Sequence, residues 1–113
     1  MLISKDHWGT FVWSYLHTIS IFCDEKIPEV EFHKIKNLLK NIKEIIPCKT
    51  CKDEYSKYVP SLTLIKYSTL QKDRMILFKW GFIVHNRVNQ KLNKRIYTYE
   101  EAIKKWTKKA KKV

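Results

Sequence analysis

The motif Cys48-Lys49-Thr50-Cys51 has the sharpest chemical potential in this sequence. If Cys48 begins a helix, Cys51 lies one turn further along the same face, and the two sulfurs come within reach of a disulfide. The partial positive charge of a helix N-terminus favours thiolate, as do the cations of Lys49 and Lys52. Because thiolate is the species that attacks disulfides, the motif predicts a pair that cycles between dithiol and disulfide.

This motif alone has two other interpretations. As half of a zinc site it needs two more ligands, and the other Cys and His residues do not form the second close pair that structural zinc sites usually have. As part of a thioredoxin-like domain it needs a βαβ pattern nearby, and strand signals are almost lacking here. We therefore predict no metal site. The residues considered as further ligands are Cys23, His7, His17, His33 and His85.

Aromatic, imidazole and amide side chains form a second group. Trp13 and His17 are four residues apart and share one helical face, and His85 and Asn89 do the same, with Asn86 one turn before Asn89. Taken singly, these residues could be core histidines with ordinary partners or surface asparagines. On facing helices they would form a polar lining inside an apolar bundle, which is a usual place for a cofactor.

Such a lining suits an aromatic cofactor that carries phosphate. Indole faces can stack on a ring system, and Asn or His can bond its edges. Lys94, Arg95 and Lys105 could meet a pyrophosphate. The sequence has no GxGxxG motif, so a Rossmann dinucleotide site is excluded.

The elements that must position these groups are helices. Only 2 Gly and 3 Pro occur in 113 residues, which argues against the many tight turns of an all-β domain. Pro47 and Pro60 each end a helix, and Thr98 with Glu101 forms a capping-box signature. Together these signals predict an all-α four-helix bundle with a short fifth helix, in a single domain of residues 1–113. The helices are expected at 7–22, 29–45, 48–58, 70–92 and 99–109, with 61–69 as a loop.

The formal net charge of +12 indicates which kinds of partner the protein can attract, but it says nothing about the fold. The Lys-rich end from about residue 104 is read as a solvated helix terminus, where cations suit the helix dipole. Residues 1–10 have no secretory signal pattern, and no apolar run approaches the ~20 residues that span a bilayer. We therefore expect a soluble protein made in the cytoplasm.

The motifs in their order resemble the Erv/ALR sulfhydryl oxidases over nearly the whole chain. Each motif alone is weak to moderate evidence, and the ordered set is highly specific. The matching residues are His7-Trp8-Gly9, Trp13-x-x-Leu16-His17, Pro47-Cys48-x-x-Cys51, Trp80, His85-Asn86-x-Val88-Asn89-x-x-Leu92-Asn93-Lys94 and Trp106.

The resemblance implies a helical bundle that binds FAD without covalent attachment and forms a homodimer. It implies that thiols and O₂ react to give a disulfide and H₂O₂, with a protein dithiol or a thioredoxin-like relay protein as substrate. By position, Cys51 would lie next to the flavin and Cys48 would exchange with substrate. The positions implied to bind FAD are Trp8, Gly9, Trp13, His17, Tyr55, Phe82, His85, Asn86, Val88, Asn89, Leu92, Asn93, Lys94, Lys105 and Trp106.

This chain also departs from the family pattern. Asn93 stands where cellular members commonly have Gly, Ile46 replaces an aromatic residue before Pro-Cys, and Phe82 occupies a position often filled by Cys. The compact form looks like the stand-alone enzymes of large cytoplasmic DNA viruses, which would place it in host cytoplasm or virion. Cys23 is left without an assigned role and could be a small buried residue or a shuttle thiol.

The strongest alternative is a basic helical nucleic-acid-binding module without catalysis. The +12 charge and the lysines around Trp106 support it. It explains neither the Cys48–Cys51 motif nor the His and Asn lining, so we regard nucleic acid as an unlikely partner.

Overall fold

A computed structural model describes residues 12–14, 16–18 and 27–110, with side chains through Lys105. All regular structure in these residues is helical, with no strand, which confirms the all-α prediction. Within the same residues, no helix is long and apolar enough to cross a membrane. The helices are α2 (Glu29–Asn41), η2 (Ile42–Ile45), α3 (Lys49–Lys57), α4 (Val59–Thr63), α5 (Tyr67–Lys72), α6 (Ile76–Lys91) and α7 (Tyr99–Ala110), and 12–14 and 16–18 are also helical.

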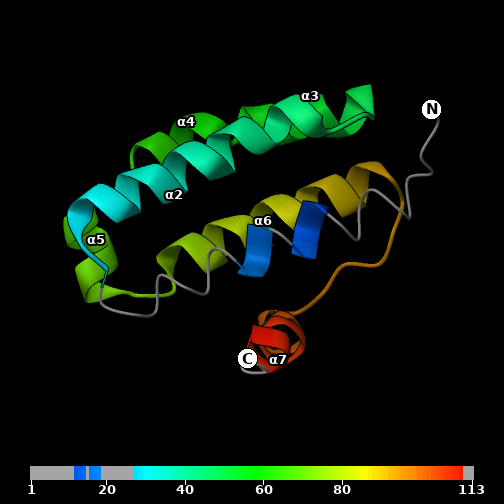
Figure 1. Cartoon of the computed structure of the whole chain (residues 1–113). Helices are drawn as coiled ribbons and strands as arrows, with labels where there is room; N and C mark the ends of the chain where they lie inside the picture. Colours follow the sequence, from blue (N-terminus) through cyan, green and yellow to red (C-terminus); the bar gives the residue numbers. More distant parts are fainter. Residues whose placement is uncertain (1–11, 15, 19–26, 111–113) are drawn as a thin grey trace.

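Helix α6 occupies the middle of the arrangement (Figure 1). Helices α2, α3 and α4 lie together on one side of it, and α7 lies on the other side, viewed nearly along its own axis. The residues that precede α2 and are helical, 12–14 and 16–18, run beside α6. The bundle therefore brings segments from both ends of the chain to one central helix.

The predicted helix over 29–45 is confirmed, although its last turn is tighter than the rest. The α-helical part ends at Asn41, and Ile42–Ile45 continue as the 3-10 turn η2. Ile46 then leaves the helix with ψ of 114°, because the ring of Pro47 disfavours helical backbone in the residue before it. This extended step places Cys48 at the start of the next helix.

The helix predicted before Pro60 is confirmed, since α3 ends at Lys57, but the prediction that a loop follows over residues 61–69 is wrong. Helix α4 starts at Val59 with Pro60 in its first turn, where a missing N–H costs nothing because no helical partner exists there. Residues 61–69 are therefore largely helical, in α4 and the start of α5.

The prediction of a single helix over 70–92 is also wrong, because the helical conformation is interrupted at Asp73. Asp73 is extended, with φ of −138° and ψ of 95°. Its carboxylate accepts the Met75 N–H at 3.1 Å and pairs with Lys79 at 2.7 Å. A short acidic side chain that bonds its own neighbouring backbone competes with the helix, so α5 ends at Lys72 and α6 begins at Ile76.

Both ends of the connection from α6 to α7 follow known capping rules. Asn93 has a positive φ of 56°, and the Asn93 and Lys94 N–H groups return to the carbonyls of Gln90 and Asn89. This pattern is a Schellman motif. The predicted capping box is confirmed, since Thr98 N–H bonds Glu101 Oε1 at 3.0 Å and Glu101 N–H bonds Thr98 Oγ1 at 3.2 Å.

The buried side chains form two clusters of unequal size. The larger unites residues from 12–18, α2, η2, α3, α4, α5 and α6, including Trp13, Leu16, Cys51, Tyr55 and Val88. The smaller joins α7 to α6 through Phe78 and Ala102, with Phe82 and Tyr99 packed against them. Helix α7 is therefore held mainly by its own small cluster.

Candidate active site

Cys48 and Cys51 occupy the first turn of α3. Cys48 is the N-cap residue, and its Sγ accepts the Cys51 N–H at 3.4 Å. Negative charge on this sulfur is therefore stabilised by an amide dipole and by the helix N-terminus. Cys51 is fully buried, with 0% of its surface exposed, whereas Cys48 is only partly buried. The two thiols thus differ in access to solvent.

Lys49, next to Cys48, has an acidic partner of its own. Lys49 pairs with Asp53 at 2.9 Å, in an exposed ion pair. Exposed pairs of this kind contribute little energy. The α3 N-terminus is therefore the more direct source of stabilisation for a Cys48 thiolate.

Tyr55 lies one turn after Cys51 on α3 and is close to other aromatic rings. It is fully buried, its ring centroid is 6.3 Å from that of Trp13, and its hydroxyl donates to the Leu39 carbonyl. Burial raises the pKa of the Tyr55 hydroxyl, so this group stays protonated and ties α3 to α2. Cys51, Tyr55 and Trp13 belong to one buried cluster.

Two histidines lie beyond Trp13 and bond to each other. His17 Nε2 and His85 Nδ1 are 3.0 Å apart, and the Trp13 ring stacks on His85 with centroids 4.1 Å apart. Burial, aided by the charge of Lys105, lowers the pKa of His17 to about 3. Burial, His17 and the cations of Lys105 and Lys94 lower the pKa of His85 to about 2. Both imidazoles are therefore neutral near pH 7.

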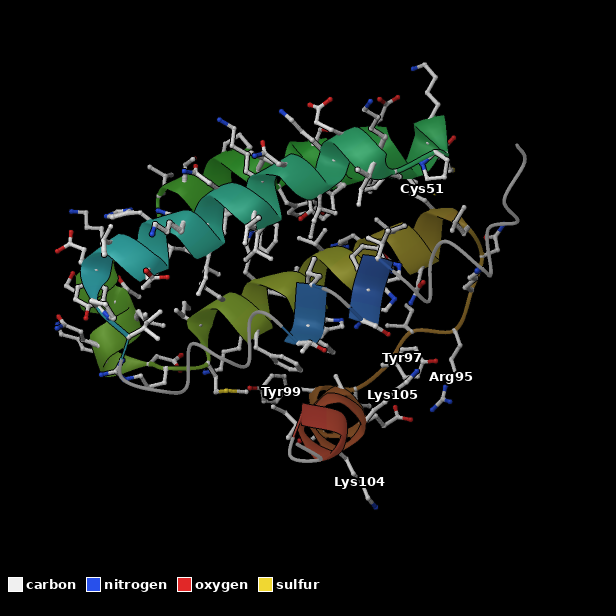
Figure 2. All side chains as sticks on the ribbon, in the orientation of Figure 1. Cys51, Arg95, Tyr97, Tyr99, Lys104 and Lys105 are labelled. Carbon is white, nitrogen blue, oxygen red and sulfur yellow. The ribbon has the colours of Figure 1, made fainter. Side chains whose placement is uncertain are left out.

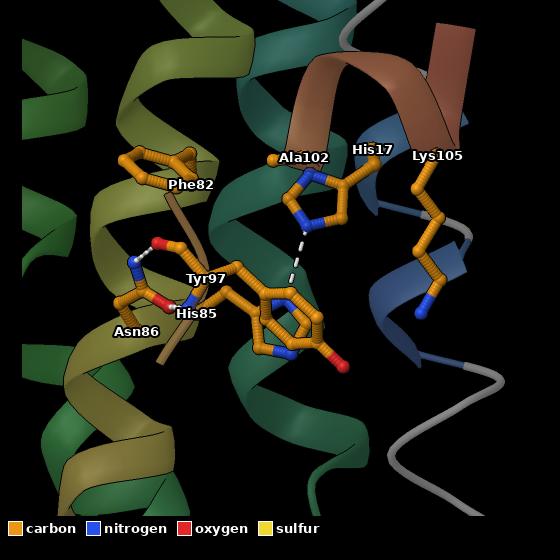
Figure 3. Close-up of a pocket in the computed structure, with 7 residues that line it drawn as sticks. All are labelled: His17, Phe82, His85, Asn86, Tyr97, Ala102 and Lys105. Atoms are coloured by element: carbon orange, nitrogen blue, oxygen red, sulfur yellow. Dashed lines mark hydrogen bonds between the residues drawn. The ribbon is translucent and has the colours of Figure 1, made fainter. Parts of the chain in front are cut away.

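A pocket opens beside the histidine pair, between α6 and α7 (Figure 3). Its empty volume is about 280 Å³, including its opening to solvent. One wall comes from α6 and another from Tyr97 in the connection to α7. The pocket combines aromatic faces, neutral imidazoles and one cation. The lining residues are His17, Phe82, His85, Asn86, Tyr97, Ala102 and Lys105.

Two cationic side chains lie close to the Tyr97 ring at this pocket. Arg95 lies 4.8 Å from the ring centroid and Lys105 Nζ lies 5.3 Å from it. Arg95 also pairs with Glu101. In Figure 2, Arg95, Tyr97 and Lys105 lie on the α7 side of α6, and Cys51 lies on the α3 side. Trp13 contacts both Tyr55 and His85, so it connects the core around Cys51 to the pocket.

Comparison with known proteins identifies this arrangement. A model of the Erv1 / Alr family matches residues 10–109. The chain belongs to the Erv1/Alr family. Its relatives include an "FAD-linked sulfhydryl oxidase" of African swine fever virus, which is 30% identical over 95 residues, covering 84% of this chain and 76% of that protein. No solved structure matches the chain.

Two further relatives come from different organisms. The "Probable FAD-linked sulfhydryl oxidase R368" of Acanthamoeba polyphaga mimivirus is 23% identical over 101 residues, covering 89% of this Erv1/Alr chain and 69% of the relative. The "FAD-linked sulfhydryl oxidase ERV2" of Saccharomyces cerevisiae is 33% identical over 94 residues, covering 82% of this chain but 45% of the yeast protein.

The structure gathers part of the residue set that the Erv/ALR resemblance implied. Five of those residues line the pocket, and Trp13 and Tyr55 belong to the same buried cluster as Cys51. Val88 and Asn89 are buried in α6, and Leu92 is partly buried. Asn93 and Lys94 are exposed at the end of α6. Trp8, Gly9, the Trp106 side chain, His7 and Cys23 lie outside the described residues.

Sequence reasoning missed two residues of the pocket. Ala102 belongs to the apolar face of α7, so helical periodicity could have identified it as buried but not as pocket lining. Tyr97 lies in a connection without periodicity, and no sequence signal marks it. Among the residues with described positions, no three His, Cys, Asp or Glu side chains gather as metal ligands would.

Proposed function

We propose that this chain is an FAD-linked sulfhydryl oxidase in which Cys48 and Cys51 are the redox-active pair. The observation that carries the proposal is the burial of Cys51 in the same cluster as Tyr55 and Trp13. Trp13 in turn stacks on an imidazole of the pocket. A dithiol on an outer surface, far from any cavity, would have argued against this function.

The pocket residues suit a flavin. Membership of the Erv1/Alr family and the printed names of the relatives point to FAD. Neutral imidazoles can donate and accept hydrogen bonds, and the rings of Trp13 and Tyr97 offer aromatic faces. Lys105 and Lys94 are cations close enough to His85 to lower its pKa, and such groups can hold a pyrophosphate. When bound, FAD supplies a two-electron acceptor that O₂ reoxidises, with H₂O₂ as product.

The two cysteines exchange disulfides with the substrate in a fixed order. A substrate thiolate attacks Cys48 Sγ in the oxidised pair, a mixed disulfide forms, and Cys51 leaves as thiolate. The second substrate thiol attacks the mixed disulfide and releases Cys48. The substrate is oxidised by two electrons, and Cys48 and Cys51 are reduced to a dithiol. The partial exposure of Cys48 and the full burial of Cys51 support this order.

The substrate is a protein dithiol or a thioredoxin-like relay protein, and the enzyme acts as a homodimer. Exposed apolar side chains on α2 and η2 support self-association, since Val30, Leu38 and Ile45 have 59%, 44% and 58% of their surface exposed. The similarity to viral relatives supports action in host cytoplasm or virion. Sedimentation of the purified protein tests the dimer directly.

The decisive experiment is a visible absorption spectrum of the purified protein with a peroxide assay driven by dithiothreitol. We expect a yellow protein that consumes O₂ and produces H₂O₂ in proportion to the dithiol oxidised. A protein that stays colourless after incubation with FAD contradicts the proposal. If that colourless protein binds DNA with a steep salt dependence, the +12 charge serves nucleic-acid binding instead.

A further inference from the structure

The side-chain amide of Asn86 is bound at both of its polar atoms by a single residue, Tyr97. Asn86 Nδ2 donates to the Tyr97 carbonyl at 2.8 Å, and the Tyr97 N–H donates to Asn86 Oδ1 at 3.0 Å (Figure 3). Because one partner only donates and the other only accepts, the orientation of the amide is unambiguous. Asn86 therefore pairs with a backbone peptide unit in the way that a neighbouring strand would.

This pairing acts on the connection between α6 and α7. At one end, the Asn93 and Lys94 N–H groups bond the last turn of α6. At the other end, Thr98 and Glu101 form the capping box of α7. Asn86 ties the peptide of Tyr97 to α6 between these two ends, and so fixes where the connection crosses the pocket.

The position of this peptide decides where the pocket's aromatic wall and cations lie. The Tyr97 ring is 6.4 Å from the His85 ring, 4.8 Å from Arg95 and 5.3 Å from Lys105 Nζ. Among the side chains that the structure describes, α7 packs on α6 through a small buried cluster around Phe78 and Ala102. A shift of the Tyr97 peptide would therefore move the ring and change its contacts with both cations.

We infer that Asn86 is a positioning residue of the flavin pocket, which acts through Tyr97 and Lys105. The resemblance to the Erv/ALR family implied only that Asn86 contacts FAD. The inference rests on the proposed function, because it assigns the pocket to FAD. In this structure both polar atoms of the amide are already engaged with Tyr97.

The first test measures amide hydrogen exchange in the protein without FAD. Asn86→Ala removes the acceptor of the Tyr97 N–H, and we expect that amide to exchange at least about tenfold faster, given the energy of one buried hydrogen bond. The control is Gln90→Ala, which alters an exposed side chain on the same helix. Unchanged exchange at Tyr97 in Asn86→Ala overturns the inference.

The second test measures the dissociation constant of FAD by titration of the same proteins. We expect about a tenfold weaker affinity for Asn86→Ala and no change for Gln90→Ala. Lys105→Gln should also weaken binding in the wild-type background. In the Asn86→Ala background its effect should shrink to less than about twofold, because Lys105 is no longer held at the pocket.

The outcomes separate this inference from the proposed function. Additive effects of Asn86→Ala and Lys105→Gln would show that Asn86 does not act through Lys105, and would overturn the inference alone. Equal FAD affinity in the wild type and Asn86→Ala would do the same. A wild-type protein that fails to bind FAD overturns the proposed function and the inference with it.

Discussion

The burial of Cys51 and the partial exposure of Cys48 support the different roles that we propose for these two cysteines. A substrate thiol can reach Cys48 at the N-cap of α3, while Cys51 is enclosed with Tyr55 and Trp13. The amide N–H that Cys48 Sγ accepts stabilises the thiolate formed when a mixed disulfide is resolved. In the proposed mechanism, the different burial of these two neighbouring thiols determines the order in which they react.

The Cys51→Ser variant tests that order. We expect it to retain visible flavin absorbance and to lose dithiol-driven peroxide production completely, because no inner thiol remains to pass electrons on. Cys48→Ser should be equally inactive toward a protein dithiol. If Cys23→Ala remains active, a shuttle role for Cys23 is excluded. Normal peroxide production by Cys51→Ser would refute the assignment.

Asn93 shows how a backbone requirement can explain a residue type. Its φ of 56° lies in the left-handed region, and its N–H closes the Schellman motif at the end of α6. Gly adopts this conformation without strain and Asn tolerates it. This explains why the family pattern has Gly at the position, and it gives Asn93 a role that needs no cofactor.

Comparison of Asn93→Ala with Asn93→Gly separates the backbone role of Asn93 from a role of its side chain. We expect Asn93→Ala to lower the free energy of unfolding by about 1 kcal/mol, because Ala lacks the short polar side chain with which Asn tolerates positive φ. Asn93→Gly should match or exceed the wild type. Urea unfolding of the protein without FAD measures both. If Gly destabilises as much as Ala, the side chain of Asn93 matters and not its backbone.

At the scale of elements, Gly81 lets the N-terminal helical residues approach α6 closely. A Cβ at Gly81 would lie 2.3 Å from Leu16 Cδ2 and 3.8 Å from His17 Cε1. Leu16 is fully buried, so it has little room to move aside. The close approach of Leu16 to Gly81 also brings the neighbouring His17 within hydrogen-bonding distance of His85.

We expect Gly81→Ala to destabilise the protein by about 1–3 kcal/mol, the usual cost of overpacking a core. Because Leu16 precedes His17, the variant should also bind FAD more weakly than its loss of stability alone explains. Thermal unfolding and FAD titration measure the two effects. Arg87→Ala on the exposed face of α6 is the matched control. A Gly81→Ala protein with wild-type stability and affinity would contradict this packing argument.

At the scale of the whole molecule, the buried His17 and the partly buried His85 couple folding to pH. In the unfolded chain each would titrate near pH 6.5, whereas the folded pKa values are about 3 for His17 and about 2 for His85. The unfolded state therefore binds more protons below pH 6.5. Their contribution to stability is complete above that pH and is lost progressively as the pH falls toward the folded values.

We expect the free energy of unfolding to fall between pH 6.5 and 5 by at most about 1.4 kcal/mol per pH unit for each histidine. Urea unfolding of the protein without FAD at a series of pH values measures the slope. His17→Gln should reduce it, and His33→Gln, at an exposed position on α2, should not. An unchanged slope in His17→Gln would contradict the coupling.

The sequence could predict features that depend on neighbours a few residues apart. The spacing of Cys48 and Cys51, the capping box of Thr98 and Glu101, and the helical character of most segments are of this kind. Local backbone rules act over one or two turns, which is why periodicity and caps located α2, α3 and α7. The same rules failed at Pro60 and Asp73, because a proline can begin a helix as well as end one and because the carboxylate of Asp73 competes with the helix for backbone hydrogen bonds.

Contacts between distant segments were decided only by the tertiary structure. The sequence placed His17 and His85 on separate helices but could not show that they bond each other, and it gave no sign that Asn86 would hold Tyr97. Such pairs depend on how the helices pack, which follows from the shapes of many buried side chains together. The residue types of this chain thus determine its helical character and the close spacing of Cys48 and Cys51, and the packing around α6 determines which residues form the pocket.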